Sequence, residues 1–301
     1  MSSSPKIIIN ADDLGFSPNV NTAILRCAER GTITAASVMV NMPFIESALQ
    51  QSQERTPHLS LALHFTLTSG KPVSLPQDVP LLVDANGFFR LGFVSLWKML
   101  TSKQRTVLLS QIKTEFFAQM NLMNQLATKY QLRFDHLDSH QHIHVLPGIW
   151  ELLQQEATQC RLTLRVPRER WGNLKRWCRR SWAWLSGGLC KQKILNHCLR
   201  KVPQSIGYFG ILETGRMDAS ALRTIFQLVG QCRSFDTYEI NTHPSALTEI
   251  NQQGELCCSK ADKQFHVSPW REREFQALNC TDVLQWAQQY GITLAGFIEM
   301  K

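Results

Sequence analysis

Strand-like segments alternate with helix-like segments along the whole chain, and this alternation restricts the fold more than any other feature. Short β-branched runs bounded by polar or turn residues occur at positions 6–10, 33–41, 59–68, 134–138, 161–166, 205–210, 237–242 and 293–297. Such alternation predicts parallel strands joined by helical crossovers. About seven parallel strands favour an α/β fold with a distorted, TIM-like (β/α) barrel over an open sheet.

The helix-like segments contain start and stop signals that are typical of helix ends. Ser17 supplies an N-cap and Pro18 fits the first helical position, while Gly31 ends the same segment. Other helices are predicted at residues 43–53, 101–130, 148–159, 219–232 and 281–290. A length of 301 residues suits one barrel, so we expect a single domain over residues 1–301.

Composition indicates a folded protein with reduced thiols. Hydrophobic residues make up 44% of the chain, which is enough for a sizeable core. No window approaches the run of about 18 apolar residues that predicts a membrane-spanning helix, and the opening MSSSPKIIIN lacks the apolar core of a secretory signal. The nine cysteines show no CxxC pair, which argues against a disulfide framework or a cysteine-based zinc site. These features favour a cytoplasmic protein.

The positive charge is concentrated in residues 168–201, which we term the basic insertion. It holds ten Lys and Arg residues and a single acid, Glu169, whereas the whole chain has a net charge of only +8. The same segment contains four of the eight tryptophans: Trp171, Trp177, Trp182 and Trp184. A lid packed on the barrel, docking on the inner face of an anionic membrane and nucleic-acid binding are the alternatives. The lack of a recognisable nucleic-acid-binding module disfavours the last of them.

Residues that can bind metals or transfer protons follow several of the predicted strands. Asp12 and Asp13 follow the first strand, and His64 lies in the third. His243 follows a late strand, and residues 136–144 read HLDSHQHIH, with four histidines in nine positions. In an α/β barrel the C-terminal strand ends form one mouth, where active sites are built. The four segments are therefore predicted to converge.

Taken singly, these features have ordinary structural explanations. The Asp12-Asp13 pair could serve a turn or a helix cap, and His64 could be a hydrogen-bonded core histidine. The joint pattern favours a metal site instead. One carboxylate and two imidazoles leave open positions for water and a substrate carbonyl. A second carboxylate can take a proton from that water, and a further histidine can protonate a leaving amine.

The adjacent Asp12 and Asp13 are predicted to share two of these tasks. Successive side chains of a strand point to opposite faces, so one carboxylate would bind the metal and the other would act as base. Their adjacency alone does not decide which residue has which role.

The combined motifs resemble those of the YdjC-type carbohydrate deacetylases, a family with a distorted (β/α) barrel related to the polysaccharide deacetylases. The NADDxG opening of that family matches residues 10–15, its LHxxLT segment matches 63–68, and its HxDSHxHxH segment matches 136–144. His243-Pro244 matches the HP pair after a late strand. The resemblance implies a hydrolase that removes the acetyl group from an amino sugar of the N-acetylglucosamine type.

The resemblance also implies roles for individual residues. The metal ligands would be Asp13, His64 and His140. Asp12 would be the general base, and His243 would be the catalytic acid. The cofactor would be a divalent ion, with Mg²⁺ as the first choice and Zn²⁺ as the alternative, because the donor set suits either.

A narrower resemblance points to the YdjC-type deacetylases of hopanoid biosynthesis. It rests on residues 165–169, 209–210 and 214–217, with the basic insertion placed between them. That subgroup would act on an N-acetylglucosamine attached to a hopanoid lipid. Membrane contact through the basic insertion would then bring the site to its substrate.

Other functions account for parts of the sequence. A chitooligosaccharide deacetylase acting on soluble glycans would have the same site. A peripheral membrane or nucleic-acid-binding protein on a barrel scaffold is disfavoured, because a scaffold has no use for converging metal ligands. Another metal-assisted hydrolysis, such as phosphoester cleavage, would retain both the fold and the metal.

Overall fold

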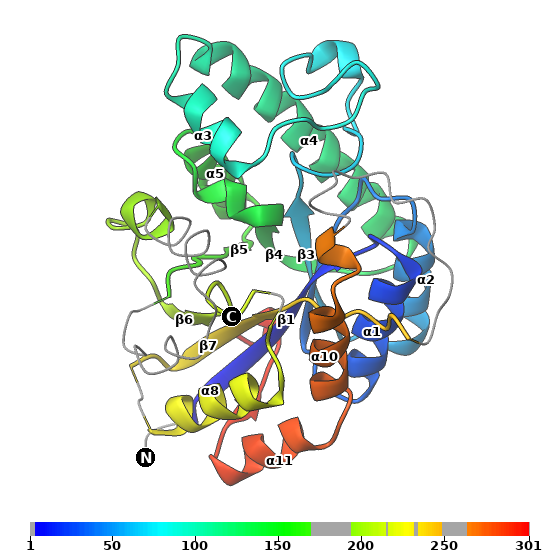
Figure 1. Ribbon diagram of the computed structural model, residues 1–301, viewed down its shortest axis with the longest axis vertical. Helices are drawn as coiled ribbons and strands as arrows, with labels where there is room; N and C mark the ends of the chain where they lie inside the picture. The colour runs from blue at the N-terminus through cyan, green and yellow to red at the C-terminus, as the bar shows by residue number, and fades with distance from the viewer. Residues whose placement is uncertain (1–3, 170–193, 215, 232–233, 249–263, 301) are drawn as a thin grey trace.

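Parallel strands form the centre of the protein (Figure 1). The computed structural model describes residues 4–169, 194–214, 216–231, 234–248 and 264–300. The strands are β1 (Lys6–Leu14), β2 (Ala35–Val38), β3 (Ser60–Phe65), β4 (Phe134–Ser139), β5 (Thr163–Leu164), β6 (Ile206–Phe209), β7 (Thr237–Thr242) and β8 (Thr293–Leu294). All pairings between these strands are parallel, which confirms the α/β fold.

The sheet curls into a half-barrel. Seven strands follow one another in the order β5-β4-β3-β2-β1-β7-β6, and β8 pairs with the first residues of β1. This arrangement confirms the predicted distorted barrel. Within the described part of the chain, β5 and β6 at the two ends of the order are not paired with each other. The basic insertion connects these two strands in sequence, and residues 170–193 of it lie outside the described residues.

Helices join and cover the strands. They are α1 (Pro18–Glu29), α2 (Ile45–Arg55), α3 (Phe93–Leu100), α4 (Arg105–Lys129), α5 (Ile149–Gln159), α8 (Ala219–Gln231), α10 (Pro269–Leu278) and α11 (Asp282–Gln289). Short 3-10 helices occur at η1 (Pro76–Asp78), η2 (His140–Val145) and η3 (Phe297–Met300). The Ser17 side chain caps α1 by accepting from the Val20 N–H, as predicted. The sequence patterns do not predict α3 and α10.

Burial on both faces of β1 explains its uninterrupted apolar start. Residues 7–9 are three isoleucines, all fully buried. Ile8 packs inside the half-barrel in a small cluster with Phe297, whereas its two neighbours belong to the main core that includes the helices. Because side chains alternate along a strand, Asn10 and Asp12 continue the inner face of Ile8 toward the C-terminal end of β1. Polar groups thereby enter the barrel at that end.

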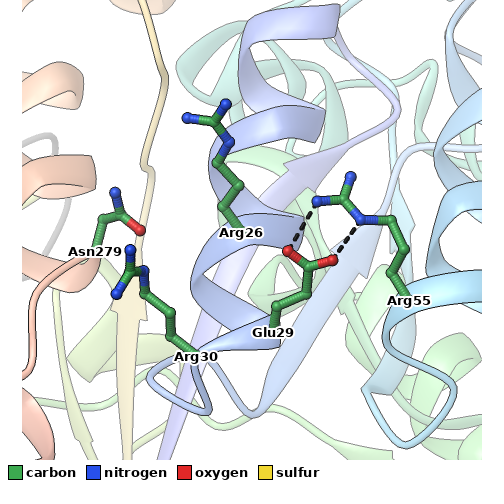
Figure 2. Close-up of a pocket in the computed structure, with 5 residues that line it drawn as sticks. All are labelled: Arg26, Glu29, Arg30, Arg55 and Asn279. Atoms are coloured by element: carbon green, nitrogen blue, oxygen red, sulfur yellow. Dashed lines mark hydrogen bonds and ion pairs between the residues drawn. The ribbon is translucent and has the colours of Figure 1, made fainter.

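A surface pocket of about 320 Å³ lies at the C-terminal ends of α1 and α2 (Figure 2). Its lining residues are Arg26, Glu29, Arg30, Arg55 and Asn279. Arg26 and Arg55 occupy the last turns of the two helices, where cations complement the helix dipole, and Arg55 pairs with Glu29. Helix C-termini lie at the end of a barrel opposite to the C-terminal strand ends, so this pocket is separate from the predicted site.

Among the described helices, none is both long enough and apolar enough to cross a bilayer.

Candidate metal centre

The two adjacent aspartates at the end of β1 converge on one imidazole. His64 Nε2 lies 3.9 Å from an oxygen of Asp12 and 3.6 Å from an oxygen of Asp13. The prediction that they point to opposite faces is therefore wrong. Asp13 has a φ of 76°, in the left-handed region, and the register between β1 and β2 shifts between Ala11 and Leu14. This bulge breaks the alternation of side chains and brings both carboxylates to the same place.

Asp13, His64 and His140 form a compact group of metal-binding side chains. His64 belongs to β3 and His140 begins η2, so three separate segments contribute. One ligand atom from each residue lies within 4.8 Å of the others. Asp13 Oδ1 is 3.2 Å from His140 Nδ1 and 3.6 Å from His64 Nε2.

These separations fit a common ion. Ligand atoms that are each about 2.1 Å from one ion lie about 3.0 Å apart at a right angle and about 3.4 Å apart at the tetrahedral angle. The separations of 3.2 and 3.6 Å between Asp13 Oδ1 and the two imidazole nitrogens are close to this range. The buried carboxylate and imidazoles can therefore bind a divalent metal ion.

Asp138 on β4 fixes the ring of His64. Its Oδ1 lies 2.6 Å from His64 Nδ1. Burial raises the pKa of Asp138, but Arg165 and His64 lower it by a larger amount, so the pKa lies below its ordinary value. The ionised carboxylate can only accept hydrogen bonds. His64 Nδ1 must therefore donate, which in the neutral ring leaves the lone pair of Nε2 directed toward Asp13.

Asp12 is surrounded by hydrogen-bond donors. Its Oδ1 accepts from Asn10 Nδ2 at 2.9 Å and from Arg165 Nη2 at 3.1 Å. Its Oδ2 accepts from Asn241 Nδ2 at 3.0 Å. Burial raises the pKa of Asp12, but Arg165 and His64 outweigh this effect and the pKa is lowered. Asp12 is thus held as an ionised carboxylate in a fixed orientation.

Arg165 joins the ends of several strands. It is fully buried just after β5, and its Nη1 lies 2.7 Å from Asp138 Oδ2 while its Nε donates to Glu239 on β7 at 2.7 Å. Burial raises the pKa of Glu239 to about 7, although Arg165 opposes this shift. Together with its bonds to Asp12, these contacts make Arg165 the common partner of three carboxylates.

His243 lies next to Asp12 at the end of β7. Its Nε2 is 3.6 Å from Asp12 Oδ2, and its main-chain N–H donates to Glu274 Oε2 at 2.6 Å. Burial lowers the pKa of His243 to about 4, although Asp12 and Asp13 act in the opposite direction. The ring is therefore neutral near pH 7.

The other histidines of residues 136–144 do not belong to the ligand group. His136 Nδ1 lies 2.7 Å from Asp135 Oδ1, and its ring stacks on Phe297 at 3.9 Å. His144 lies between Ser139 and the main-chain oxygen of residue 165, and burial lowers its pKa to about 3. His142 has a left-handed φ of 58°. The run thus contributes one side chain, His140, to the candidate ligand group.

Sequence patterns miss Arg271, which also contacts this centre. Its Nη1 donates to Asp13 Oδ2 at 3.0 Å from helix α10. A signal for α10 is present in the sequence, since Ser268-Pro269 repeats the N-cap and proline seen at the start of α1. No local pattern indicates that Arg271 reaches the end of β1, because that contact spans most of the chain.

The model of the family described as YdjC-like protein matches residues 6–289. A carbohydrate deacetylase of Brevibacillus brevis is 29% identical over 98% of this chain and 99% of its own length. A chitooligosaccharide deacetylase of Proteus mirabilis is 35% identical over 54% of this chain and 59% of its own length.

Among solved structures, one from Enterococcus faecalis has the same fold over nearly the whole chain. That protein, provisionally assigned as a cellobiose-phosphate cleavage protein, is 23% identical and superposes with a TM-score of 0.70 over 99% of both chains. This likeness concerns the fold alone. Because the family model covers nearly all of the sequence, the chain belongs to the YdjC-like protein family and is an enzyme of the hydrolase class, with carbohydrate deacetylases among its relatives.

Proposed function

We propose that this protein is a metal-dependent deacetylase that hydrolyses the N-acetyl group of an amino sugar of the N-acetylglucosamine type. The metal ligands are Asp13, His64 and His140. Asp12 is the general base, and His243 is the catalytic acid. The observation that carries the proposal is the approach of one oxygen of Asp13 to both imidazoles, beside a second carboxylate. The names of the relatives support the same reaction.

The surroundings of the two aspartates support this division of roles. Asp13 directs Oδ1 to both His64 and His140, while its Oδ2 accepts from Arg271. Asp12 lies near His64, but side-chain donors already occupy both of its oxygens. A ligand must face the other ligands, whereas a base needs only to reach the attacking water. This geometry favours Asp13 as the ligand.

A divalent ion in this centre would polarise the acetamide carbonyl and lower the pKa of a neighbouring water molecule. The identity of this ion is proposed from the chemistry of its ligands. Carboxylates suit Mg²⁺, whereas imidazoles suit Zn²⁺ and related ions. We retain Mg²⁺ as the first choice and Zn²⁺ as the alternative.

Asp12 and His243 are placed to carry a proton across the site. Since His243 is neutral near pH 7, it has no additional proton to donate until it receives one. Its Nε2 lies 3.6 Å from Asp12 Oδ2. A proton that Asp12 takes from water can therefore pass to His243 Nε2 and then to the nitrogen of the departing amine.

The proposal is tested by acetate release from the purified, metal-depleted chain after addition of Mg²⁺, Zn²⁺ or Co²⁺. We expect acetate from chitooligosaccharides or from a glycolipid bearing N-acetylglucosamine with at least one ion, and none without metal. A phosphate monoester serves as the control substrate, because phosphoester cleavage would retain the same fold and ion. Acetate release that persists without metal, or its absence with every ion and substrate, would contradict the proposal.

The nature of the sugar acceptor is the finer part of the proposal. We favour a lipid-linked substrate, such as N-acetylglucosamine on a hopanoid, with soluble chitooligosaccharides as the alternative. Support comes from the sequence of the basic insertion, which concentrates cations and tryptophans just after β5. Residues 170–193 of it lie outside the described part of the structure, so contact with the inner membrane face stays a prediction.

Replacing Lys175, Arg176, Arg179 and Arg180 by Gln should weaken binding to anionic vesicles. Each cation near such a surface contributes about 1 kcal/mol, so four replacements predict a loss of up to about 10³-fold. Parental binding should itself weaken as salt shortens the Debye length from about 10 Å at 0.1 M to about 3 Å at 1 M. Vesicle sedimentation measures both effects. Hydrolysis of a small soluble substrate is the control and should hardly change; equal vesicle binding by variant and parent would refute membrane docking.

A further inference from the structure

Arg271 on α10 is a fully buried cation with an unusual set of contacts. Its Nη1 donates to Asp13 Oδ2 at 3.0 Å and to His266 Nδ1 at 2.7 Å. Among the described residues, none accepts a hydrogen bond from its buried Nε or Nη2. Buried N–H groups without partners cost stability, so folding alone gives no reason for a guanidinium here. The contact with Asp13 gives such a reason.

The position of Arg271 is held from two sides. The ring of His266 stacks on Phe16, with centroids 3.3 Å apart and an interplanar angle of 12°. Phe16 follows Asp13 by three residues, so His266 packs against the same turn that contains the Asp13 carboxylate. Phe265 makes the second contact, because Arg271 Cζ lies over its ring, 4.9 Å from the ring centroid. Helix α10 itself packs beside α1, which starts directly after this turn (Figure 1).

We propose that Arg271, oriented by His266, is a positioning residue that makes Asp13 a one-oxygen metal ligand. Because Arg271 occupies Oδ2, only Oδ1 of Asp13 faces His64 and His140. Partners of this kind, one step beyond the ligands, set ligand orientation and commonly change metal affinity by about 10–100-fold. The inference rests on the proposed function in one respect, namely that Asp13 binds the metal.

A second physical effect acts in the opposite direction. The guanidinium carries a positive charge and repels a cation in the neighbouring centre. If repulsion were the larger effect, removal of Arg271 would tighten metal binding. If orientation is the larger effect, as we propose, removal weakens it. The sign of the change in affinity therefore decides between the two.

The experiment measures Co²⁺ binding to the metal-depleted full chain by calorimetry and by visible absorption. Arg271→Met, which keeps a similar length without donors, should weaken Co²⁺ binding by about 10–100-fold and alter the absorption bands, since both oxygens of Asp13 become available. Arg271→Lys keeps the charge and a donor, so it should lose less. Arg273→Met is the matched control, because Arg273 is an exposed residue of the same helix that packs on Trp270.

A cycle with His266 tests whether the two residues act in series. His266→Leu should weaken Co²⁺ binding less than Arg271→Met, and adding it to Arg271→Met should cause no further loss. Parental affinity and spectrum in Arg271→Met, tighter binding, or additive losses in the double variant would each overturn the proposal. Should Arg271→Met not fold, Arg271→Lys and His266→Leu carry the same test. If the parental protein binds Co²⁺ but releases no acetate, the proposed function is refuted. The Co²⁺ affinities of the variants would still decide whether Arg271 positions Asp13.

Discussion

Asp12→Asn is expected to retain the metal ion but to lower the rate of acetate release by about 10²–10⁴-fold, the usual cost of removing a general base. The amide is nearly isosteric with the carboxylate but cannot accept a proton from water. Metal content is expected to be preserved, because Asp12 is not one of the three proposed ligands Asp13, His64 and His140, although its carboxylate also lies close to His64 and Asp138. Single-turnover rates and metal analysis of the same sample measure the two properties.

Two further variants make this result interpretable. Asp135→Asn also replaces a buried carboxylate, but Asp135 bonds Ser60 and His136 away from the ligand group, so its turnover should stay near that of the parent. Asp13→Asn should empty the metal centre. If Asp12→Asn empties it and Asp13→Asn does not, the roles of the two aspartates are exchanged.

His140→Ala is expected to abolish divalent-ion binding and, with it, acetate release. One of three ligands is lost, and His140 lies in η2 near the barrel mouth, so the folded state should survive. His64→Ala should have the same effect on the metal. Its folding cost should be larger, because His64 lies within β3 and its removal leaves an oxygen of Asp138 without its 2.6 Å partner. Calorimetric titration with Zn²⁺ and Co²⁺, together with circular dichroism, separates loss of metal from loss of fold.

His144→Ala is the matched control for both ligand variants. It removes a buried histidine from the same nine-residue run, but His144 bonds Ser139 and a main-chain oxygen instead of facing Asp13. We expect it to retain stoichiometric metal. Full metal occupancy in His140→Ala, or an equal loss in His144→Ala, would remove the support for the ligand assignment.

Local patterns predict most of the elements that build the barrel. The isoleucine run of β1 and the Ser-Pro start of α1 are detected because buried parallel strands and capped helices leave signals within a few residues. Helix α10 begins with the same Ser-Pro signal, yet its sequence pattern does not predict a helix. Its burial pattern explains the omission: Arg271, Glu272 and Glu274 are buried charged residues, so α10 lacks the apolar stripe that marks an amphipathic helix.

Sequence patterns predict side chains that can bind a metal and their position at the ends of strands. Parallel strands all end at one mouth, which predicts that Asp12-Asp13, His64, residues 136–144 and His243 converge, whereas the choice of Asp13, His64 and His140 as ligands rests on the resemblance to the YdjC-type deacetylases. The difference between the two adjacent carboxylates arises from tertiary contacts. A left-handed φ at Asp13 brings both to His64, and two buried arginines, Arg165 for Asp12 and Arg271 for Asp13, distinguish them. Each arginine lies more than 150 residues away along the chain, and no periodicity or spacing in a sequence encodes a contact at that distance.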